Sequence, residues 1–349
     1  MSKAKRGATR LKKQLAEAEE NHTSKRKTEA GVSPEKRAKH PLDNGENEQD
    51  NEQQQQPSQS SVDERVMSAS ELAKNVLSLA KHSRKLLGAH VSAAGGLQNA
   101  LANAAEIGCR SLALFVRNQR TWTAKPMEEE IVAKFRNTCK EFGYDGRHVL
   151  PHGSYLMNPG APDDTILAKT RTALVDEVQR CERLGVTLYN FHPGSTCGKS
   201  SVSECIQRIA DTINHVHAST GGTVKLVVET MAGQGSTVGG KFSELRDIIA
   251  KVHDKKCVGI CLDTCHIFAA GYDIRAAKAY EKTMTEFNDH GLFDYLCAVH
   301  LNDSKGQIGV AGFRNLMNDP RFDGMPMVLE TPEGDYAKEM MMLYEMQRG

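Results

Sequence analysis

The sequence has 349 residues with 45 Lys and Arg against 44 Asp and Glu, so its net charge of +1 is close to balanced. It contains no apolar run long enough to span a bilayer and no secretory hydrophobic segment at its start, so we expect a soluble intracellular protein without membrane association. The nine cysteines form no CxxC pair and are odd in number, which argues against a disulfide framework and favours reduced thiols.

Residues 1–84 make up an extension that we expect to be disordered. They include the run QDNEQQQQPSQSS at 49–61 and contain no Trp, Tyr or Phe, so they cannot bury enough apolar surface to offset the entropy of ordering. Only residues 66–80 have the pattern of an amphipathic helix.

The charge of this extension is divided along its length. Residues 1–40 hold twelve Lys or Arg against five Glu, whereas residues 41–64 hold seven acidic residues and no basic one. Two basic clusters, Lys25-Arg26-Lys27 and Lys36-Arg37-Ala38-Lys39, have the spacing of a bipartite nuclear import signal, although a solvated lysine-rich linker is the alternative. We therefore expect a nuclear protein, with a mitochondrial fraction as a second interpretation because the first thirteen residues are basic.

From residue 85 onward, short apolar runs alternate with helical patterns. The predicted strands are 85–90, 111–116, 148–152, 187–191, 224–229, 258–263, 296–302 and 326–330. The predicted helices are 97–107, 128–142, 165–184, 202–218, 241–253, 275–289, 311–317 and 336–347. Eight such units over residues 85–349 predict an α/β fold, a (β/α)8 TIM barrel, with a doubly wound open sheet as the alternative. We interpret Cys257, Cys261 and Cys265, around one of these strands, as core residues.

A metal-capable side chain stands at the end of six predicted strands: His152, His192, Glu229, Asp263, His300 and Glu330. Parallel barrel strands bring their carboxyl ends to one mouth, where such enzymes keep their active sites. A single histidine there would more often be a hydrogen-bonded core residue, but three buried carboxylates beside three histidines need a cation between them. This mixture of ligands suits zinc, with manganese as second choice, and predicts a multinuclear metallohydrolase.

Eight long motifs follow one another along the same region. They are GAHVSAAGGL (88–97), LFVRNQRTW (114–122), LPHGSYL (150–156), NFHPGS (190–195), ETMAGQGS (229–236), LDTCHIFAAGYD (262–273), HLNDSK (300–305) and FDGMPMVLET (322–331). The series closely resembles the endonuclease IV family of apurinic/apyrimidinic endonucleases. The resemblance implies a DNA-repair enzyme on a TIM barrel with a trinuclear zinc site, acting on double-stranded DNA that contains abasic sites.

The resemblance assigns ligands position by position. By this resemblance, His152 and His192 hold the first zinc ion, and Asp263, His300 and Glu330 hold the second. Glu229 bridges the two ions. We assign Glu229 and Glu330 to catalysis. His266 corresponds to a ligand of the third zinc, and its spacing of three from Asp263, where strand gives way to loop, lets both side chains face one cavity.

Arg120, Tyr155 and Leu156 match the family residues that enter DNA at an abasic site. Tyr and Leu offer apolar surface to the base stack, while Arg can fill the gap and bind phosphate. Without the resemblance, they would be interpreted as a loop arginine and a half-buried apolar pair.

The segment after HLNDSK departs from the family pattern. The family carries a longer loop here, with an Asp and a His that complete the third zinc site, whereas in this chain Lys305 runs directly into Gly306 and no histidine follows His300. Asp303 is the nearest remaining carboxylate, and the resemblance does not make it a ligand. We therefore expect two intact zinc sites, an incomplete third site, and weakened or lost turnover with damage binding partly retained.

Three functions stay open at this point. The first is a zinc-dependent endonuclease, acting as a monomer, that hydrolyses the phosphodiester 5′ to abasic sites in base excision repair and is impaired by the short loop. The second is an abasic-DNA-binding protein or inactive isoform without turnover. A sugar isomerase on a similar barrel is a third and weaker hypothesis, because its site should be dominated by carboxylates with a catalytic lysine.

Overall fold

A computed structural model describes residues 68–303, 308–331 and 334–347. Residues 1–67, which include the two basic clusters of the extension, and the segment from Ser304 to Gln307 lie outside the described residues. None of the helices within these three ranges is long and apolar enough to cross a membrane.

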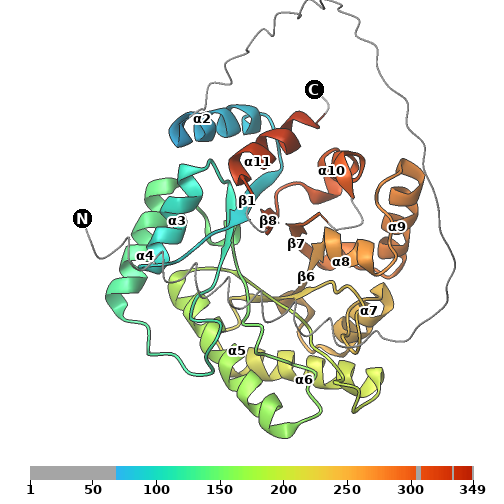
Figure 1. Cartoon of the computed structure of the whole chain (residues 1–349). Coiled ribbons are helices and arrows are strands. Elements are labelled where there is room, and N and C mark those ends of the chain that lie inside the picture. The colour runs from blue at the N-terminus through green and yellow to red at the C-terminus, as the bar shows by residue number, and fades with distance from the viewer. Residues whose placement is uncertain (1–67, 304–307, 332–333, 348–349) are drawn as a thin grey trace, which may run out of the picture. The chain divides into compact units, whose positions relative to one another are not determined.

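Eight parallel strands form the centre of the molecule (Figure 1). They are β1 Leu86–His90, β2 Ser111–Leu114, β3 Val149–Pro151, β4 Leu188–Phe191, β5 Lys225–Glu229, β6 Val258–Asp263, β7 Leu296–Leu301 and β8 Pro326–Leu329. Their order in the sheet is β3-β2-β1-β8-β7-β6-β5-β4. A parallel bridge between His152 and Asn190 joins the two outer strands, so the sheet closes into a barrel and the predicted (β/α)8 fold is confirmed.

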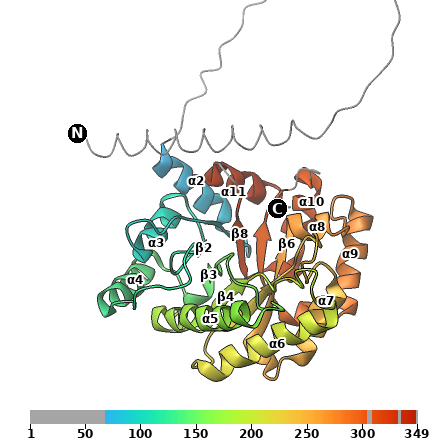
Figure 2. The ribbon, with the colours of Figure 1, turned by 60° about the horizontal axis from the view of Figure 1, so that its bottom comes forward.

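Helices surround the barrel on its outer side (Figures 1 and 2). They are α2 Ala69–Ala80, α3 Leu97–Glu106, α4 Glu129–Phe142, α5 Asp164–Leu184, α6 Val202–Ser219, α7 Phe242–Lys251, α8 Thr264–Ala269, α9 Ala277–Asp289, α10 Gly309–Met317 and α11 Tyr336–Glu345. All the predicted helices of the barrel are present, and the short helix α8 was not predicted. The sequence analysis was wrong to place His266 on a loop, because it lies on α8.

Helix α2 is the amphipathic helix expected within 66–80. It begins at Ala69 because the Ser68 hydroxyl accepts the backbone N–H of Glu71, while the Glu71 carboxylate accepts the backbone N–H of Ser68. Its residues Val76 and Ala80 are buried in the core, and the helix packs beside α11 (Figure 2). Residues 69–80, counted with the extension in the sequence analysis, therefore pack as part of the barrel unit.

The core has two layers. The larger one lies between the helices and the outer face of the strands. The barrel interior is filled by one side chain from each of seven strands: Ala113, Leu150, Leu188, Val227, Cys261, Ala298 and Val328. All nine cysteines are free. Cys261 is a core residue as expected, whereas the expectation was wrong for Cys257 and Cys265, which are only half-buried.

Gly88 allows β1 to lie unusually close to β2. A Cβ atom at this position would stand 1.7 Å from the backbone oxygen of Ser111, so any larger residue would push the two strands apart. This close approach fixes the position of the carboxyl end of β1, where His90 lies.

A charged cluster ties β1 to the segment before β8, at the end of the barrel opposite the strand carboxyl ends. Lys85 is fully buried, and its Nζ lies 2.8 Å from Asp323 Oδ1 and donates to the backbone oxygen of Asp319. The Asp319 carboxylate accepts hydrogen bonds from the Tyr280 hydroxyl at 2.6 Å and from Arg321 Nε at 2.9 Å. The cluster therefore stabilises the start of the first and last strands together.

Candidate metal centre

The six side chains predicted at strand ends gather at one mouth of the barrel. Glu229 and Asp263 are the last residues of β5 and β6, and His300 is the last residue but one of β7. The other three each follow directly on the end of a strand: His152, His192 and Glu330. Because all eight strands are parallel, these ends share one face of the molecule.

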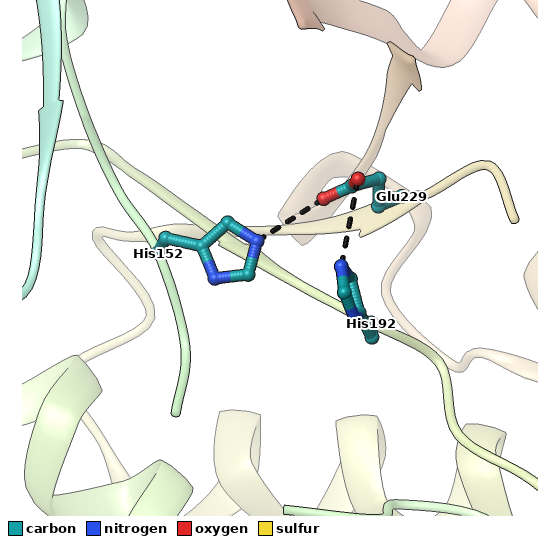
Figure 3. A group of neighbouring side chains, drawn as sticks. All are labelled: His152, His192 and Glu229. Carbon is teal, nitrogen blue, oxygen red and sulfur yellow. Dashed lines mark ion pairs between the residues drawn. The ribbon is translucent and has the colours of Figure 1, made fainter. Parts of the chain in front are cut away.

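Glu229 lies at the centre of this group. Its Oε2 is 3.3 Å from His152 Nε2 and 3.3 Å from His300 Nδ1, and its Oε1 is 3.5 Å from His192 Nε2. Figure 3 shows the rings of His152 and His192 pointing toward this carboxylate from two different loops. Glu229 is almost completely buried, so its charge must be compensated by these neighbours or by a cation.

Two groups of side chains have ligand atoms close enough together to hold one metal ion each. The first consists of His152, His192 and Glu229, and the second of Glu229, Asp263 and His300. Among the described residues Glu330 is a member of neither group, although its Oε2 lies 3.4 Å from His300 Nδ1. Glu229 belongs to both groups, which is the geometry of a carboxylate that bridges two ions.

His266 points into the same centre from helix α8. Its Nδ1 lies 3.1 Å from Glu229 Oε1 and 3.8 Å from Asp263 Oδ1, and it faces the backbone oxygen of Thr230 at 2.8 Å. Burial lowers the pKa of His266, but the hydrogen bond to Glu229 and the charge of Asp263 outweigh burial and raise the pKa to about 9. It is not a member of either group of ligand atoms within the described ranges.

The segment that follows β7 is short. Asp303 is exposed, and its carboxylate accepts the backbone N–H of Ile308 at 2.7 Å, directly before α10 begins at Gly309. Asp303, the nearest remaining carboxylate in the sequence analysis, thus contacts the backbone directly before α10.

The carboxylates and histidines of the centre strongly shift one another's pKa values. Burial raises the pKa of Glu229, but the charges of His300 and His192 outweigh it and hold the pKa well below its ordinary value. Burial likewise acts to raise the pKa of Glu330, but the charge of His300 holds it at about 2. For Asp263, burial dominates and the pKa is raised. The histidines and carboxylates thus compensate part of one another's charge, and a cation bound between them would compete with protons for the histidine nitrogens.

The surroundings of His300 indicate whether these residues suit a cation. Both of its ring nitrogens are buried, and neither has a hydrogen-bond partner among the described residues. Its Nδ1 nevertheless faces Glu229, Glu330 and Asp263 at 3.3, 3.4 and 4.0 Å. A buried nitrogen without a hydrogen bond that faces three carboxylates fits a metal ligand, so the donor set suits a metal ion such as zinc.

Two asparagines hold the carboxylates in place, and sequence reasoning missed both. Asn190, fully buried in β4, donates from Nδ2 to Glu229 Oε2 at 2.6 Å. Asn302, directly after β7, donates from Nδ2 to Asp263 Oδ2 at 2.5 Å. Their position inside the NFHPGS and HLNDSK motifs was the available signal.

The three residues expected to contact DNA lie beside this centre. Tyr155 is 61% exposed and Leu156 is 37% exposed, and the ring of Tyr155 stands 5.3 Å from that of His152 and 5.5 Å from that of His192. Arg120 is exposed on the loop after β2, and Ser154 donates to the backbone oxygen of Gln119 at 2.6 Å, which connects the two loops.

A cavity of about 760 Å³ opens next to Arg120 on the same face. It lies between the loops that follow β1 and β2, and Lys125 and Arg180 line it together with Arg120. The mouth of the barrel thus combines a buried anionic centre with exposed aromatic, apolar and basic side chains around it.

Comparison with known proteins gives concordant matches. A family model described as a xylose isomerase-like TIM barrel matches residues 101–346. An apurinic-apyrimidinic endonuclease of Caenorhabditis elegans is 52% identical over 288 residues, which cover 78% of this chain and 72% of that protein. A probable endonuclease 4 of Phocaeicola vulgatus is 49% identical over 275 residues, covering 74% of this chain and 98% of the relative. The crystal structure of endonuclease IV from Thermus thermophilus matches with a TM-score of 0.65 at 27% identity, over 74% of this chain and 97% of that chain.

Proposed function

The chain belongs to the endonuclease IV family of apurinic/apyrimidinic endonucleases, and from this we propose that it is a zinc-dependent DNA-repair endonuclease. Its substrate is double-stranded DNA that contains an abasic site, and the bond hydrolysed is the phosphodiester on the 5′ side of that site. The reaction is a step of base excision repair.

The observation that carries this proposal is the position of Glu229 between two groups of ligands. Its carboxylate belongs both to the group with His152 and His192 and to the group with Asp263 and His300. Zinc ions bound in such a pair of sites lower the pKa of water and neutralise charge on phosphoryl oxygens. In this chain Glu229 would be a ligand common to both ions.

Residues around the centre supply the other parts of the reaction. Glu330 would help to hold the second ion, and we assign it and Glu229 to catalysis through the ions that they would hold. Tyr155 and Leu156 present apolar surface beside the centre, suited to a DNA helix that lacks one base. Arg120, exposed on the neighbouring loop, can bind phosphate.

The third zinc site is the part of the family pattern that we propose to be impaired. His266 points into the centre, but the chain lacks the family's further Asp and His after Lys305. A third cation beside the leaving oxygen would be held weakly or not at all. We propose two zinc ions per chain and reduced turnover.

The alternative function is binding of abasic DNA without cleavage. It is favoured by the same short segment, where the Asp303 carboxylate accepts the backbone N–H of Ile308. In this case the exposed Tyr155 and Leu156 would still recognise damage, and the metal centre would be structural.

Localisation in the nucleus is a further proposal, supported by the clusters at Lys25–Lys27 and Lys36–Lys39. A mitochondrial fraction is the second choice. A fluorescent protein fused to residues 1–40 should accumulate in nuclei, and exclusion of the fusion from nuclei would contradict the proposal. We also propose that the enzyme acts as a monomer.

The proposed activity can be tested with a labelled duplex that carries one abasic site. The purified chain in zinc should cut it on the 5′ side, and should leave an undamaged duplex intact. Glu229→Gln should lower single-turnover cleavage at least about a hundredfold, because the bridging charge is lost. The matched change Glu141→Gln, on the exposed side of α4, should have no effect.

Each other outcome has a definite meaning. Binding of the abasic duplex without cleavage at any zinc concentration would favour the alternative function. Equal cleavage by wild type and Glu229→Gln would contradict the assigned centre. Failure both to bind and to cut would overturn the proposal.

A further inference from the structure

Each carboxylate of the metal centre accepts a hydrogen bond from a side chain on the neighbouring strand. The three donor–acceptor pairs are Asn190 with Glu229, Asn302 with Asp263, and His90 with Glu330. They join β4 to β5, β7 to β6, and β1 to β8, which are all adjacent in the sheet. The repetition of one arrangement at three places indicates a common role: the donor fixes the orientation of the carboxylate.

The third donor, His90, is positioned by the barrel itself. It ends β1, and the parallel register pairs Ala89 with Leu329 of β8, so that His90 and Glu330 are the next residues along the two strands. His90 Nδ1 lies 2.9 Å from Glu330 Oε1. The ring is only 16% exposed and packs at 4.7 Å from the ring of Phe115, which restricts its rotation.

The chemistry of this pair determines which ring nitrogen carries the proton. A carboxylate can only accept hydrogen bonds, so Nδ1 of His90 must be the donor. The other nitrogen, Nε2, is buried and has no hydrogen-bond partner within the ranges that the structure describes. Glu330 Oε1 is thereby engaged, while its Oε2 is turned to the centre, 3.4 Å from His300 Nδ1.

We propose that His90 is a positioning residue, whose Nδ1–H holds Glu330 in the orientation that presents Oε2 to the metal centre. The inference deepens the proposed function and rests on it, because it requires a metal ion at the second group of ligands. His90 acts through Glu330 and need not touch the substrate.

Three substitutions separate the roles of the two ring nitrogens. His90→Asn places an amide nitrogen near the position of Nδ1, so it keeps the donor to Glu330. His90→Gln places its amide near the position of Nε2 and loses that donor. His90→Phe keeps the size of the ring and removes both nitrogens.

His217 provides a matched control. It is a half-buried histidine that uses one ring nitrogen, Nε2, to contact the backbone oxygen of Cys257 at 2.9 Å. Its Nδ1 is also buried and without a hydrogen-bond partner among the described residues. It lies next to the residue that precedes β6, at the opposite end of the barrel from the metal centre. His217→Phe therefore reports what loss of such a histidine does to the fold alone.

The measurement is the zinc affinity of the purified full-length chain, by competition with a chromogenic chelator at constant pH, with thermal unfolding as a check of folding. His90→Phe should bind zinc about 10–100-fold more weakly, the usual effect of removing a residue that orients a ligand. His90→Asn should recover most of this affinity, and His90→Gln should not. His217→Phe should bind zinc as the wild type does.

Several results would overturn the inference. Wild-type affinity in His90→Phe would show that Glu330 needs no positioning donor. Recovery by His90→Gln but not by His90→Asn would mean that His90 acts through Nε2, as a ligand or a contact to substrate. If His90→Phe does not fold, the comparison of the Asn and Gln variants decides the question. Absence of zinc binding by the wild type would instead overturn the proposed function itself, so the two failures are distinguishable.

Discussion

At the scale of one residue, Tyr155 lies between the buried metal centre and the exposed surface around it. Its ring contacts the region of His152 and His192, yet more than half of the side chain is exposed to solvent. An exposed aromatic ring at this position is free to stack on a partner that approaches the centre. A base pair beside an abasic gap is a suitable partner, because stacking on an aromatic ring tolerates any base.

We predict that Tyr155→Ala weakens binding of an abasic duplex by about 1–3 kcal/mol, the usual value of one stacking contact. Binding constants can be measured by fluorescence anisotropy at fixed salt. Tyr155→Phe keeps the ring and should bind nearly as the wild type does. Zinc content should be unchanged in both variants, and a loss of zinc in Tyr155→Ala would show that the residue supports the centre and not the DNA.

The gathering of the six side chains at the barrel mouth could be predicted from sequence because each one ends or follows an apolar run of strand length. The residues that form hydrogen bonds with these carboxylates could not be predicted from sequence. Asn190 and Asn302 stand beside predicted ligands in their motifs, but their hydrogen bonds to Glu229 and Asp263 depend on which strands are neighbours and in what register. His90 also ends a strand, but its role depends on Glu330, which only the pairing of β1 with β8 brings next to it.

At the scale of an element, the start of helix α8 depends on the Asp263 side chain, whose two oxygens make different hydrogen bonds. Asp263 Oδ1 accepts the backbone N–H of His266 at 2.7 Å and so starts the helix, while Oδ2 is held by Asn302. A helix of six residues is too short to show a hydrophobic period, which is why the sequence pattern did not reveal it. The helix turns His266 toward Glu229, as the spacing of three had suggested.

The segment between β7 and α10 is the element that we expect to limit turnover. Inserting the family's Asp- and His-bearing loop between Lys305 and Gly306 would add two ligands beside His266. We predict that single-turnover cleavage of an abasic duplex rises at least about a hundredfold, on the scale of gaining one strong electrostatic stabiliser of the transition state. Affinity for the duplex should change much less.

The control for this insertion is a loop of equal length in which the added Asp and His are replaced by Asn and Gln. It should cut no faster than the wild type. If the wild type already cuts as fast as the chain with the restored loop, the third site is dispensable and the proposed impairment is wrong.

The cluster around Asp319 gives a prediction about pH. Burial acts to raise the pKa of Asp319, but hydrogen bonds from Arg321 and Tyr280 outweigh it and lower the pKa below 3.8. A lowered carboxyl pKa stabilises the fold above the unfolded value of 3.8, and this stabilisation is lost as the pH falls through the folded pKa. Asp319→Asn should therefore lower the free energy of unfolding by about 1–3 kcal/mol at neutral pH.

Urea unfolding at neutral pH and near pH 3 would check this. The difference between wild type and Asp319→Asn should narrow at the lower pH, because the wild-type carboxylate is then becoming protonated. A difference that stays constant or widens would mean that the charge of Asp319 is not what stabilises the cluster.

At the scale of the whole molecule, the point where the compact unit begins can be tested by truncation. Deleting residues 1–64 should leave cleavage nearly unchanged at moderate salt, because all the proposed metal ligands and DNA contacts lie beyond it. The basic part of the extension can still add affinity at low salt, through release of counterions. Deleting residues 1–84 removes the buried Val76 and Ala80 as well, and should lower the free energy of unfolding by at least about 2 kcal/mol.

Thermal and urea unfolding of the two truncated chains would separate these effects. Equal stability of both would show that α2 contributes nothing to the barrel. If removal of residues 1–64 caused loss of zinc or of folding, the extension would contribute to the stability of the barrel.

The central claim is that Glu229 joins two intact zinc sites while the third is incomplete, and elemental analysis of the purified chain tests it most directly. After exhaustive dialysis against metal-free buffer, the wild type should retain about two zinc ions per chain, because seven of the nine ligands expected from the family are present and the missing pair belongs to one site. Glu229→Gln measured in parallel should hold fewer. Three tightly held zinc ions in the wild type, or none, would contradict the account.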